Sequence, residues 1–317
     1  MSNILEFISK IGIVPLVVLD NKEDAVHLGK ALFNGGIPIA EVTLRTDAAI
    51  DVINEMSKIK GLCVGAGTVH TVEQAKNAIK AGATFIVTPG INVEVVKWCV
   101  NNDVLIIPGV VTPTDLELAL SLGLTHLKFF PAENFGGVKT LKAFQGPFPN
   151  MKFLPTGGIN EENFLDYLNL TNVLAVGGSF TIPNNHLKNK DWNKITETCR
   201  SMLIKKHGFK IAHIGINSEN QNKGYEVALL LAKIFGFSID EKKASYFVSP
   251  ELEIMHGNGA GTHGHIAVKC NDVENAIEYF KSIGVELNPK SYRYDENGKI
   301  NFAYLKDEIA GFAFHLV

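Results

Sequence analysis

The stretch LKFFPAE, residues 127–133, places a lysine inside an apolar run that ends at a proline. Lysine is almost never fully buried without a partner. Alternation along the strand that this run predicts would point Leu127 and Phe129 to one face and Lys128 to the other. Lys128 is therefore either an edge-strand lysine whose tip reaches water or a buried amine kept for chemistry.

This run is one of eight similar runs in the first two thirds of the chain. Short β-branched runs begin about every 20–25 residues, and helix-like amphipathic segments lie between them. Eight βα units in about 200 residues predict a (βα)8 TIM barrel, and the Gly or Pro that ends each run favours it over a doubly wound open sheet. The runs lie at residues 13–19, 39–44, 62–67, 85–90, 104–109, 126–131, 153–158 and 173–178.

The second run carries ionisable side chains on one face. Glu41 and Arg45 fall on the same side of the predicted strand, whereas the other side is apolar. Ionisable groups near the carboxyl ends of barrel strands are typical of active sites in this fold. Burial disfavours the charged form of the Lys128 amine, and a neutral amine can attack a ketone to form a Schiff base. A structural ion pair between Lys128 and Glu41 is the alternative.

Two glycine pairs end the seventh and eighth runs, in PTGGIN (155–160) and VGGS (176–179). Adjacent glycines let backbone N–H groups approach an anion closely, and the N-terminus of a following helix adds partial positive charge. Phosphate sites after strands seven and eight recur in this barrel. Either pair alone can be a plain turn, but together they predict a phosphate site.

Composition bounds the class of protein. The net charge is −3, so no basic field attracts nucleic acid. No stretch of about 18 apolar residues predicts a membrane span, and the first ten residues lack the features of a signal peptide. The four cysteines are far apart and form no Cys-x-x-Cys, which is typical of reduced thiols. We therefore expect a cytoplasmic protein with a small-molecule ligand.

The last third of the chain has a different pattern. IAHIGIN (211–217) and GHIAVKC (264–270) look like two copies of one strand, about 52 residues apart, and a helix-like segment follows each. This pattern predicts a smaller α+β domain of paired βαβββ modules over residues 210–317. A short polar link near residues 206–210 would join it to the barrel at 1–205.

Five motifs follow one another along the first part of the chain: EVTLRT (41–46), VGAGTV (64–69), LKFFPAE (127–133), PTGGI (155–159) and VGGS (176–179). Their order is that of a known family. With these motifs, residues 1–205 resemble the 2-keto-3-deoxy-6-phosphogluconate (KDPG) aldolases, also described as 4-hydroxy-2-oxoglutarate (KHG) aldolases.

The resemblance implies a class I aldolase, commonly a homotrimer, with no metal in the barrel and no cofactor beyond a covalent lysine imine. Its substrate would be a phosphorylated 2-keto-3-deoxy sugar acid. It would cleave 2-dehydro-3-deoxy-6-phosphogluconate to pyruvate and glyceraldehyde 3-phosphate, and also 4-hydroxy-2-oxoglutarate to pyruvate and glyoxylate. A galactonate-derived acid that differs at C4 is the alternative substrate.

The same resemblance implies a role for each matching residue. Lys128 would form the Schiff base and Glu41 would shuttle protons, while Arg45 and Thr68 would hold the pyruvate carboxylate. The pocket would be lined by Pro89, Phe130 and Thr156. The phosphate would be bound by Gly157, Gly158, Gly178 and Ser179.

Residues 210–317 resemble the vicinal-oxygen-chelate superfamily, which includes the glyoxalases, through the paired βαβββ pattern. Metal-binding members carry ligands on the first and last strands of each module, which correspond here to His213, Glu253, His265 and His315. His315 stands where a carboxylate is usual, so a metal-free binding or packing domain is the alternative to a divalent metal site. With a metal, the protein would be bifunctional, with a glyoxalase-like second activity.

Two other classes of function compete with the aldolase. One is a different phosphate-binding barrel enzyme, such as an isomerase or epimerase, but the apolar neighbours of Lys128 favour Schiff-base chemistry. The other is a metal-dependent lyase or small-molecule sensor whose active part is the second half, which metal analysis would distinguish.

Overall fold

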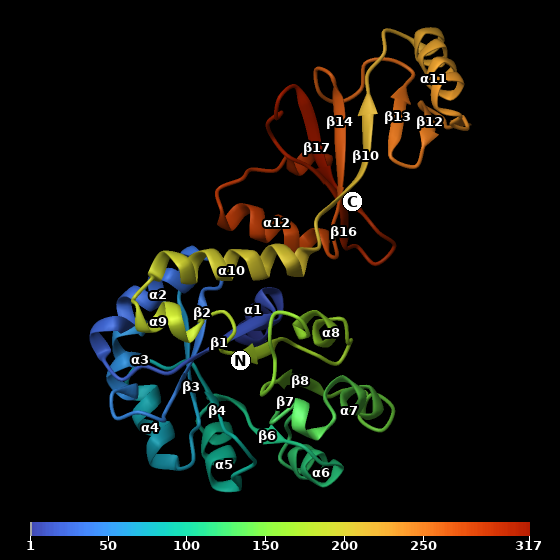
Figure 1. The fold of residues 1–317 in the computed structure, drawn as a ribbon. Helices are drawn as coiled ribbons and strands as arrows, with labels where there is room; N and C mark the ends of the chain where they lie inside the picture. The colour runs from blue at the N-terminus through green and yellow to red at the C-terminus, as the bar shows by residue number, and fades with distance from the viewer. Residues whose placement is uncertain (1) are drawn as a thin grey trace. The chain divides into compact units, whose positions relative to one another are not determined.

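The structure is a computed structural model that describes residues 2–317. The chain divides into two compact units, one ending at Met202 and one covering Leu203–Val317 (Figure 1). The division lies within helix α10 (Trp192–His207), and strand β10 begins at Lys210. No helix in the described part of the chain is long and apolar enough to cross a membrane.

The first unit alternates strands and helices, and each of the eight predicted runs overlaps one of its strands. Before α10, its elements are α1 (Ser2–Ile11), β1 (Ile13–Val17), η1 (Lys22–Asp24), α2 (Ala25–Asn34), β2 (Ile39–Thr43), α3 (Ala49–Ser57), β3 (Cys63–Gly67), α4 (Val72–Lys80), β4 (Phe85–Val87), α5 (Val93–Asn101), β5 (Leu105–Ile107), β6 (Gly109–Val110), α6 (Pro113–Ser121), β7 (His126–Phe129), η2 (Glu133–Phe135), α7 (Gly137–Phe144), β8 (Lys152–Pro155), α8 (Phe164–Leu168), β9 (Val176–Gly178) and α9 (Asn184–Lys188).

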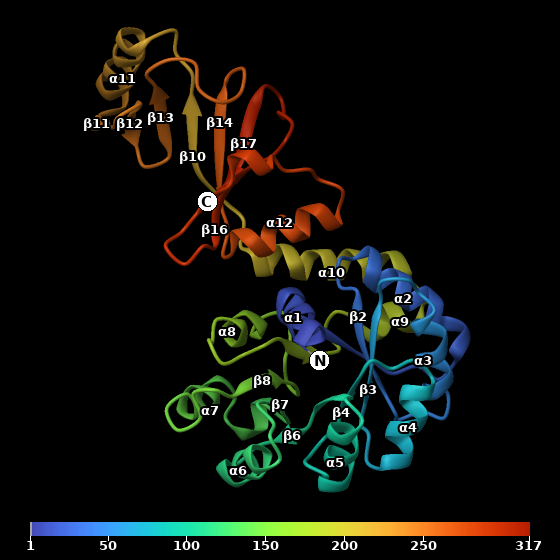
Figure 2. The same cartoon turned by 180° about the vertical axis from the view of Figure 1, so that it is seen from behind.

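The strands of this unit pair in parallel with their neighbours in the chain. Hydrogen bonds join β5-β4-β3-β2-β1-β9 into one sheet and β6-β7-β8 into another. Pro108, which has no N–H to donate, separates β5 from β6, and an isolated parallel bridge between Thr156 and Gly177 joins the end of β8 to β9. Helices α3 to α7 lie outside the strands in both views (Figures 1 and 2), as is usual for a parallel α/β unit.

Aromatic side chains fill the layer between strands and helices. Leu127 and Phe129 of β7 are fully buried, and the Phe129 ring meets Phe144 of α7 edge-on at 6.2 Å. Phe144 also lies 5.9 Å from Phe153 of β8. The alternation predicted for LKFFPAE is therefore confirmed on its apolar side, which leaves Lys128 pointing away from this layer.

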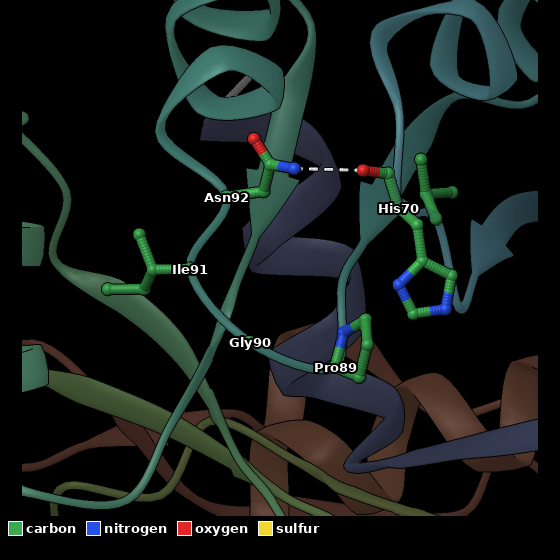
Figure 3. A pocket seen from close by; sticks show the side chains of 6 residues that line it. His70, Pro89, Gly90, Ile91 and Asn92 are labelled. Carbon is green, nitrogen blue, oxygen red and sulfur yellow. Dashed lines mark hydrogen bonds between the residues drawn. The ribbon is translucent and has the colours of Figure 1, made fainter.

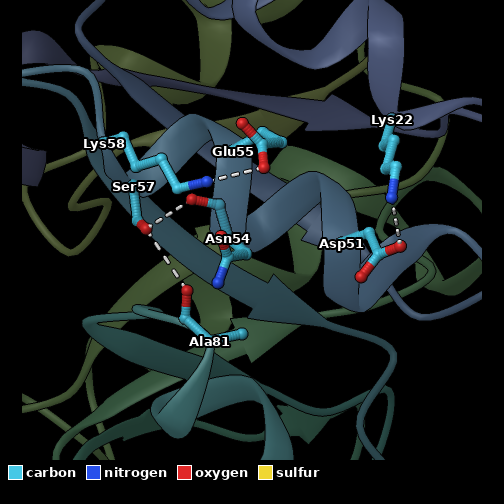
Figure 4. Close-up of polar contacts among 7 residues, drawn as sticks. All are labelled: Lys22, Asp51, Asn54, Glu55, Ser57, Lys58 and Ala81. Carbon is cyan, nitrogen blue, oxygen red and sulfur yellow. Dashed lines mark hydrogen bonds and ion pairs between the residues drawn. The ribbon is translucent and has the colours of Figure 1, made fainter.

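The helix surfaces carry local polar contacts (Figure 4). Lys58 pairs with Glu55 at 2.6 Å, and the Ser57 hydroxyl lies within hydrogen-bond distance of the Ala81 carbonyl, 3.2 Å away at the end of α4. Such exposed ion pairs typically contribute less than about 1 kcal/mol. The stability of the unit therefore comes mainly from the buried layer.

The second unit contains two copies of the order β-α-β-β-β in one eight-stranded sheet, β11-β12-β13-β10-β14-β17-β16-β15. The central strands β10 and β14 are antiparallel, and each pairs in parallel with the last long strand of its own copy, β13 or β17. The elements are β10 (Lys210–Ile216), α11 (Gln221–Phe235), β11 (Asp240–Glu241), β12 (Ser245–Ser249), β13 (Leu252–Met255), β14 (Gly264–Lys269), α12 (Val273–Ser282), η3 (Pro289–Ser291), β15 (Arg293–Tyr294), β16 (Ile300–Tyr304) and β17 (Phe312–Leu316).

Gly65 of β3 gives a test of packing in the first unit. A Cβ at this position would lie 2.2 Å from the ring of Phe85, which is fully buried. We expect Gly65→Ala to lower the free energy of unfolding by about 1–3 kcal/mol, measured by denaturant titration. Gly146→Ala is the matched control, because no atom lies within 4 Å of its added Cβ. Equal stability of the two variants would contradict the packing argument.

Candidate active site

The first unit buries a lysine against a glutamate. Lys128 of β7 and Glu41 of β2 are 4% and 0% exposed, and the distance from Lys128 Nζ to Glu41 Oε1 is 3.0 Å. Within residues 2–317, Glu41 Oε2 is buried and has no hydrogen-bond partner. The ion pair that the sequence analysis gave as the alternative is present, and one carboxylate oxygen is left over as an acceptor.

A glycine of β3 makes room for this pair. Gly65 lies opposite Glu41 in the sheet and Gly67 lies opposite Thr43. A Cβ on Gly67 would lie 2.2 Å from Glu41 Oε1 and 2.7 Å from its Cγ. The sequence analysis gave Gly67 no role, although the closely spaced glycines of GAGT were the available signal.

Phe130 and Pro89 lie near the lysine strand. The Lys128 ammonium is 5.3 Å from the centre of the Phe130 ring, within range of a cation–π contact. Gly109 pairs with Lys128, and a Cβ on Gly109 would lie 2.1 Å from the Pro89 carbonyl oxygen. Both residues therefore lie close to the strands that hold the amine.

Pro89 also lines an open pocket at the carboxyl ends of β3 and β4 (Figure 3). Asn92 closes one side of it by donating a hydrogen bond to the His70 carbonyl at 2.9 Å. Neither Lys128 nor Glu41 is among the lining residues, which are Val69, His70, Pro89, Gly90, Ile91 and Asn92. The buried ion pair, rather than this pocket, therefore defines the candidate site.

The turn after β8 is bonded to the segment that follows the lysine strand. The amide of Ala132 donates to the Thr156 carbonyl at 2.8 Å, and the amide of Glu133 donates to the Gly157 carbonyl at 3.1 Å. Thr156 is buried, and Gly157 and Gly158 have φ values of +96° and +82°, which favour glycine.

The second glycine pair ends β9, where Gly178 is buried and Ser179 is exposed. Since an isolated bridge joins the end of β8 to β9, the two predicted phosphate-binding turns come from neighbouring strands.

The expected helix N-terminus after the seventh predicted strand is absent from that place. Helix α8 begins only at Phe164. The Asn160 side chain accepts hydrogen bonds from the amides of Glu162 and Asn163, at 2.9 and 3.1 Å, and so forms a turn ahead of the helix. Asn160 therefore satisfies donors that an anion would otherwise use, and any phosphate contact here falls to the glycine turn.

Arg45 and Thr68 stand just beyond the ends of β2 and β3. The amide of Leu44 donates to the Gly67 carbonyl at 2.8 Å and ties these two ends together. Arg45 is exposed, and within residues 2–317 neither residue forms a hydrogen bond or ion pair with Lys128 or Glu41. Thr68 has φ +58°, an uncommon backbone conformation for a β-branched residue.

Glu133 and Tyr167 form a contact that the sequence analysis missed. The Tyr167 hydroxyl donates a hydrogen bond to the Glu133 carboxylate, and burial and this carboxylate raise the pKa of Tyr167. A Cβ on Gly158 would lie 2.4 Å from Glu133 Cγ. The Glu133 side chain therefore packs against the glycine turn. The final glutamate of LKFFPAE was the only sign of the contact between Glu133 and Tyr167 in the sequence.

The second unit brings together the four residues that the sequence offered as metal ligands. His213 and His265 lie 3.3 and 3.1 Å from the same oxygen of Glu253. The ligand atoms of His213, His265 and His315 all lie within 4.8 Å of one another. Burial and the neighbouring His265 and His213 lower the pKa of His315 to about 4. His315 is therefore neutral near pH 7.

Comparison with known proteins identifies the first unit. The family described as KDPG and KHG aldolase matches residues 4–198. The chain belongs to this family. It is therefore an aldolase, a carbon–carbon lyase.

Individual relatives agree with this assignment. The chain is 42% identical over 192 residues to the 2-dehydro-3-deoxy-phosphogluconate aldolase of Pseudoalteromonas atlantica, covering 60% of this chain and 89% of that one. It is also 42% identical to the KHG/KDPG aldolase of Escherichia coli K12, covering 60% and 90%. Among solved structures, KDPG aldolase from Legionella pneumophila, with pyruvate captured at low pH as a covalent carbinolamine intermediate, superposes with a TM-score of 0.61. It is 40% identical, and the match covers 62% of this aldolase and 97% of that chain.

Gly67→Ala tests the space around the ion pair. The added methyl would collide with the Glu41 carboxylate and displace it from Lys128. We expect kcat to fall by at least roughly tenfold while the variant stays folded, because a small displacement of a reacting group is costly. Steady-state kinetics with circular dichroism measure both properties, and Gly146→Ala again serves as control. An unchanged kcat would show that the position of Glu41 does not limit turnover.

Proposed function

We propose that the barrel formed by residues 1–205 cleaves 2-dehydro-3-deoxy-6-phosphogluconate to pyruvate and glyceraldehyde 3-phosphate through an imine on Lys128. The observation that carries this proposal is the buried Lys128 amine, 3.0 Å from a glutamate that keeps one unpaired oxygen. The names of the relatives support the substrate, and the covalent pyruvate adduct in the Legionella enzyme supports the chemistry.

The proposed reaction begins with proton transfer. At 3.0 Å, Glu41 can take a proton from the Lys128 ammonium and leave a neutral amine. The amine nitrogen attacks the C2 carbonyl carbon, and Glu41 returns its proton to the hydroxyl of the carbinolamine, which leaves as water to give a protonated imine and the Glu41 carboxylate. This imine provides the electron sink that the next step requires.

Bond cleavage follows from the imine. A base removes the proton of the C4 hydroxyl, the C3–C4 bond breaks, and glyceraldehyde 3-phosphate leaves. The electron pair moves into an enamine on Lys128. Protonation at C3 and hydrolysis then release pyruvate and the free amine. Glu41 Oε2 is the acceptor suited to the C4 proton, directly or through water, since it has no protein partner in the described chain.

The remaining binding roles are proposals that rest on the resemblance to the aldolase family. Arg45 and Thr68 would hold the pyruvate carboxylate, because guanidinium groups bind carboxylates in fixed geometry. The strained backbone of Thr68 supports its role, since such conformations gather at binding sites. Phe130, Pro89 and Thr156 would line the pocket. The phosphate would bind at two glycine turns, through Gly157, Gly158, Gly178 and Ser179.

The breadth of substrates and the assembly also belong to this proposal. Cleavage of 4-hydroxy-2-oxoglutarate to pyruvate and glyoxylate is supported by the relatives named KHG/KDPG aldolase. The galactonate-derived acid, which differs at C4, is the alternative. We propose that the protein is a cytoplasmic homotrimer. We also propose that the first unit is a closed (βα)8 barrel, which the parallel pairing of its strands supports.

The second unit calls for its own proposal. Residues 210–317 form a domain of the vicinal-oxygen-chelate type, and the double β-α-β-β-β order supports it. The cluster of His213, His265, His315 and Glu253 favours a second, metal-dependent function over a packing role. The aldolase residues all lie before residue 205, so the two functions would be separable.

Borohydride trapping tests the aldolase mechanism directly. Reduction in the presence of pyruvate should attach a three-carbon adduct to Lys128, identified by peptide mass mapping. Lys128→Arg keeps the charge but cannot form the imine, so it should abolish both the adduct and turnover. Lys139→Arg, an exposed lysine beyond β7, is the matched control. An adduct on another lysine, or none, would refute the mechanism.

Ser179→Asp tests the phosphate site. The new carboxylate would repel a phosphate bound at this turn, so KM for the phosphorylated sugar acid should rise at least roughly tenfold. Cleavage of 4-hydroxy-2-oxoglutarate, which lacks phosphate, should change little. Ser179→Ala controls for loss of the hydroxyl, and both substrates are compared by steady-state kinetics. Equal losses on the two substrates would contradict this placement.

A further inference from the structure

Helix α8 contacts a neighbour of each glycine turn that we propose for phosphate binding. Phe164 and Tyr167 of this helix are fully buried. The Phe164 ring lies 5.6 Å from the ring of Phe180, which directly follows Ser179 of the second turn. The Tyr167 hydroxyl donates to the carboxylate of Glu133, which borders the first turn. One short helix is therefore packed against the surroundings of both turns.

The backbone of the first turn is held at two successive carbonyls. The amide of Glu133 donates to the Gly157 carbonyl at 3.1 Å, and the Asn163 side-chain amide donates to the Gly158 carbonyl at 3.0 Å. The peptide bonds that contain these carbonyls are trans. In a planar trans peptide the C=O and the N–H point in opposite directions. The N–H of Gly158 therefore points away from the amide of Glu133. The N–H of Ile159 likewise points away from the side chain of Asn163.

These two N–H groups remain available as donors. Within residues 2–317, the amides of Gly158 and Ile159 donate no hydrogen bond to a protein acceptor. Gly158 is also exposed. Successive backbone N–H groups in a turn can bind an anion. The direction in which these two groups point therefore decides how well the turn can hold a phosphate.

The Glu133 side chain supports the same turn. Its stem lies against Gly158, where an added Cβ would be 2.4 Å from Glu133 Cγ and 2.6 Å from Glu133 Cβ. Its carboxylate accepts the hydrogen bond from Tyr167. Burial and the Glu133 carboxylate raise the pKa of Tyr167, so the hydroxyl keeps its proton and remains a donor near pH 7. Because Glu133 is exposed, this hydrogen bond holds a side chain that would otherwise be free to rotate.

We propose that Glu133 and Tyr167 are positioning residues that prepare the turn at 157–158 for the phosphate of the substrate. They act through the turn and touch no reacting atom. Glu133 sets the direction of the Gly158 N–H, and Tyr167 fixes Glu133. The inference rests on the proposed phosphate site and deepens it, because it names the residues that favour phosphorylated over unphosphorylated substrates.

Tyr167→Phe tests the inference in the full-length protein, because it removes only the hydroxyl. The ratio of kcat/KM for the phosphorylated sugar acid to kcat/KM for 4-hydroxy-2-oxoglutarate should fall roughly tenfold, about the loss of one charge-assisted hydrogen bond. The inhibition constant of inorganic phosphate should rise by a similar factor. Tyr246→Phe is the matched control, because Tyr246 is a buried tyrosine of the second unit whose hydroxyl accepts a hydrogen bond from Gln221.

Two variants of Glu133 separate the hydrogen bond from the charge. Glu133→Gln and Glu133→Leu both remove the charge, but only glutamine keeps an oxygen that can accept from Tyr167. The substrate ratio should therefore fall in Glu133→Leu and stay within about threefold of the unmodified enzyme in Glu133→Gln. The double variant Glu133→Leu/Tyr167→Phe should lose no more than Glu133→Leu alone, because both changes break one contact. A tyrosine that only fills the core would lower the melting temperature and leave the ratio unchanged.

Two results would overturn the positioning role. One is a substrate ratio in Tyr167→Phe equal to that in Tyr246→Phe, and the other is the same ratio in Glu133→Gln and Glu133→Leu. Because Glu133 is exposed, its variants test the proposal even if Tyr167→Phe does not fold.

The unmodified protein separates this proposal from the aldolase mechanism. Borohydride trapping with pyruvate involves no phosphate, so a missing adduct at Lys128 refutes the imine chemistry alone. Calorimetry with inorganic phosphate needs no turnover, and it compares the unmodified protein with Tyr167→Phe in either case. If the unmodified protein forms the adduct but does not bind inorganic phosphate, the phosphate site is refuted and the positioning role with it.

Discussion

The contact between Lys128 and Glu41 is the constraint on which the first unit depends. Taking two charges out of water costs several kcal/mol per ion, roughly, even after relaxation. The pair is 3.0 Å apart and almost fully buried, and one carboxylate oxygen has no protein partner. Hydrophobic residues of similar size would often stabilise the first unit as well or better. We therefore interpret the pair as retained for proton transfer and imine chemistry.

Space for that pair comes from glycines rather than from a large cavity. Gly67 lies against the Glu41 carboxylate, Gly109 lies against the Pro89 carbonyl, and Gly177 lies against the Thr156 hydroxyl. Each marks a place where a strand end approaches another element too closely for a methyl group. These glycines lie at or near the ends of parallel strands, beside residues for which we propose catalytic or binding roles.

The second unit also holds polar side chains in its interior, but its central strands are antiparallel. Its four polar side chains converge across an antiparallel centre, and two small residues, Gly215 and Ala267, alternate with them. In both units, therefore, buried polar groups are accommodated by small neighbours fixed by strand register. The difference is that one unit pairs a lysine with a glutamate, whereas the other gathers three histidines and a glutamate.

Local patterns in the sequence determined the strand and helix alternation, the inward face of Lys128 and the motifs of the aldolase family. These depend on periodicity and on short stretches, which a single segment contains in full. Tertiary packing between distant segments decided the rest, because such contacts join residues that no single segment contains. It buried Phe164 and Tyr167 of helix α8, which begins at Phe164 and not directly after the glycine turn. It also placed Glu41 and Lys128, 87 positions apart, in contact, and put Gly67 against the carboxylate and Tyr167 against Glu133.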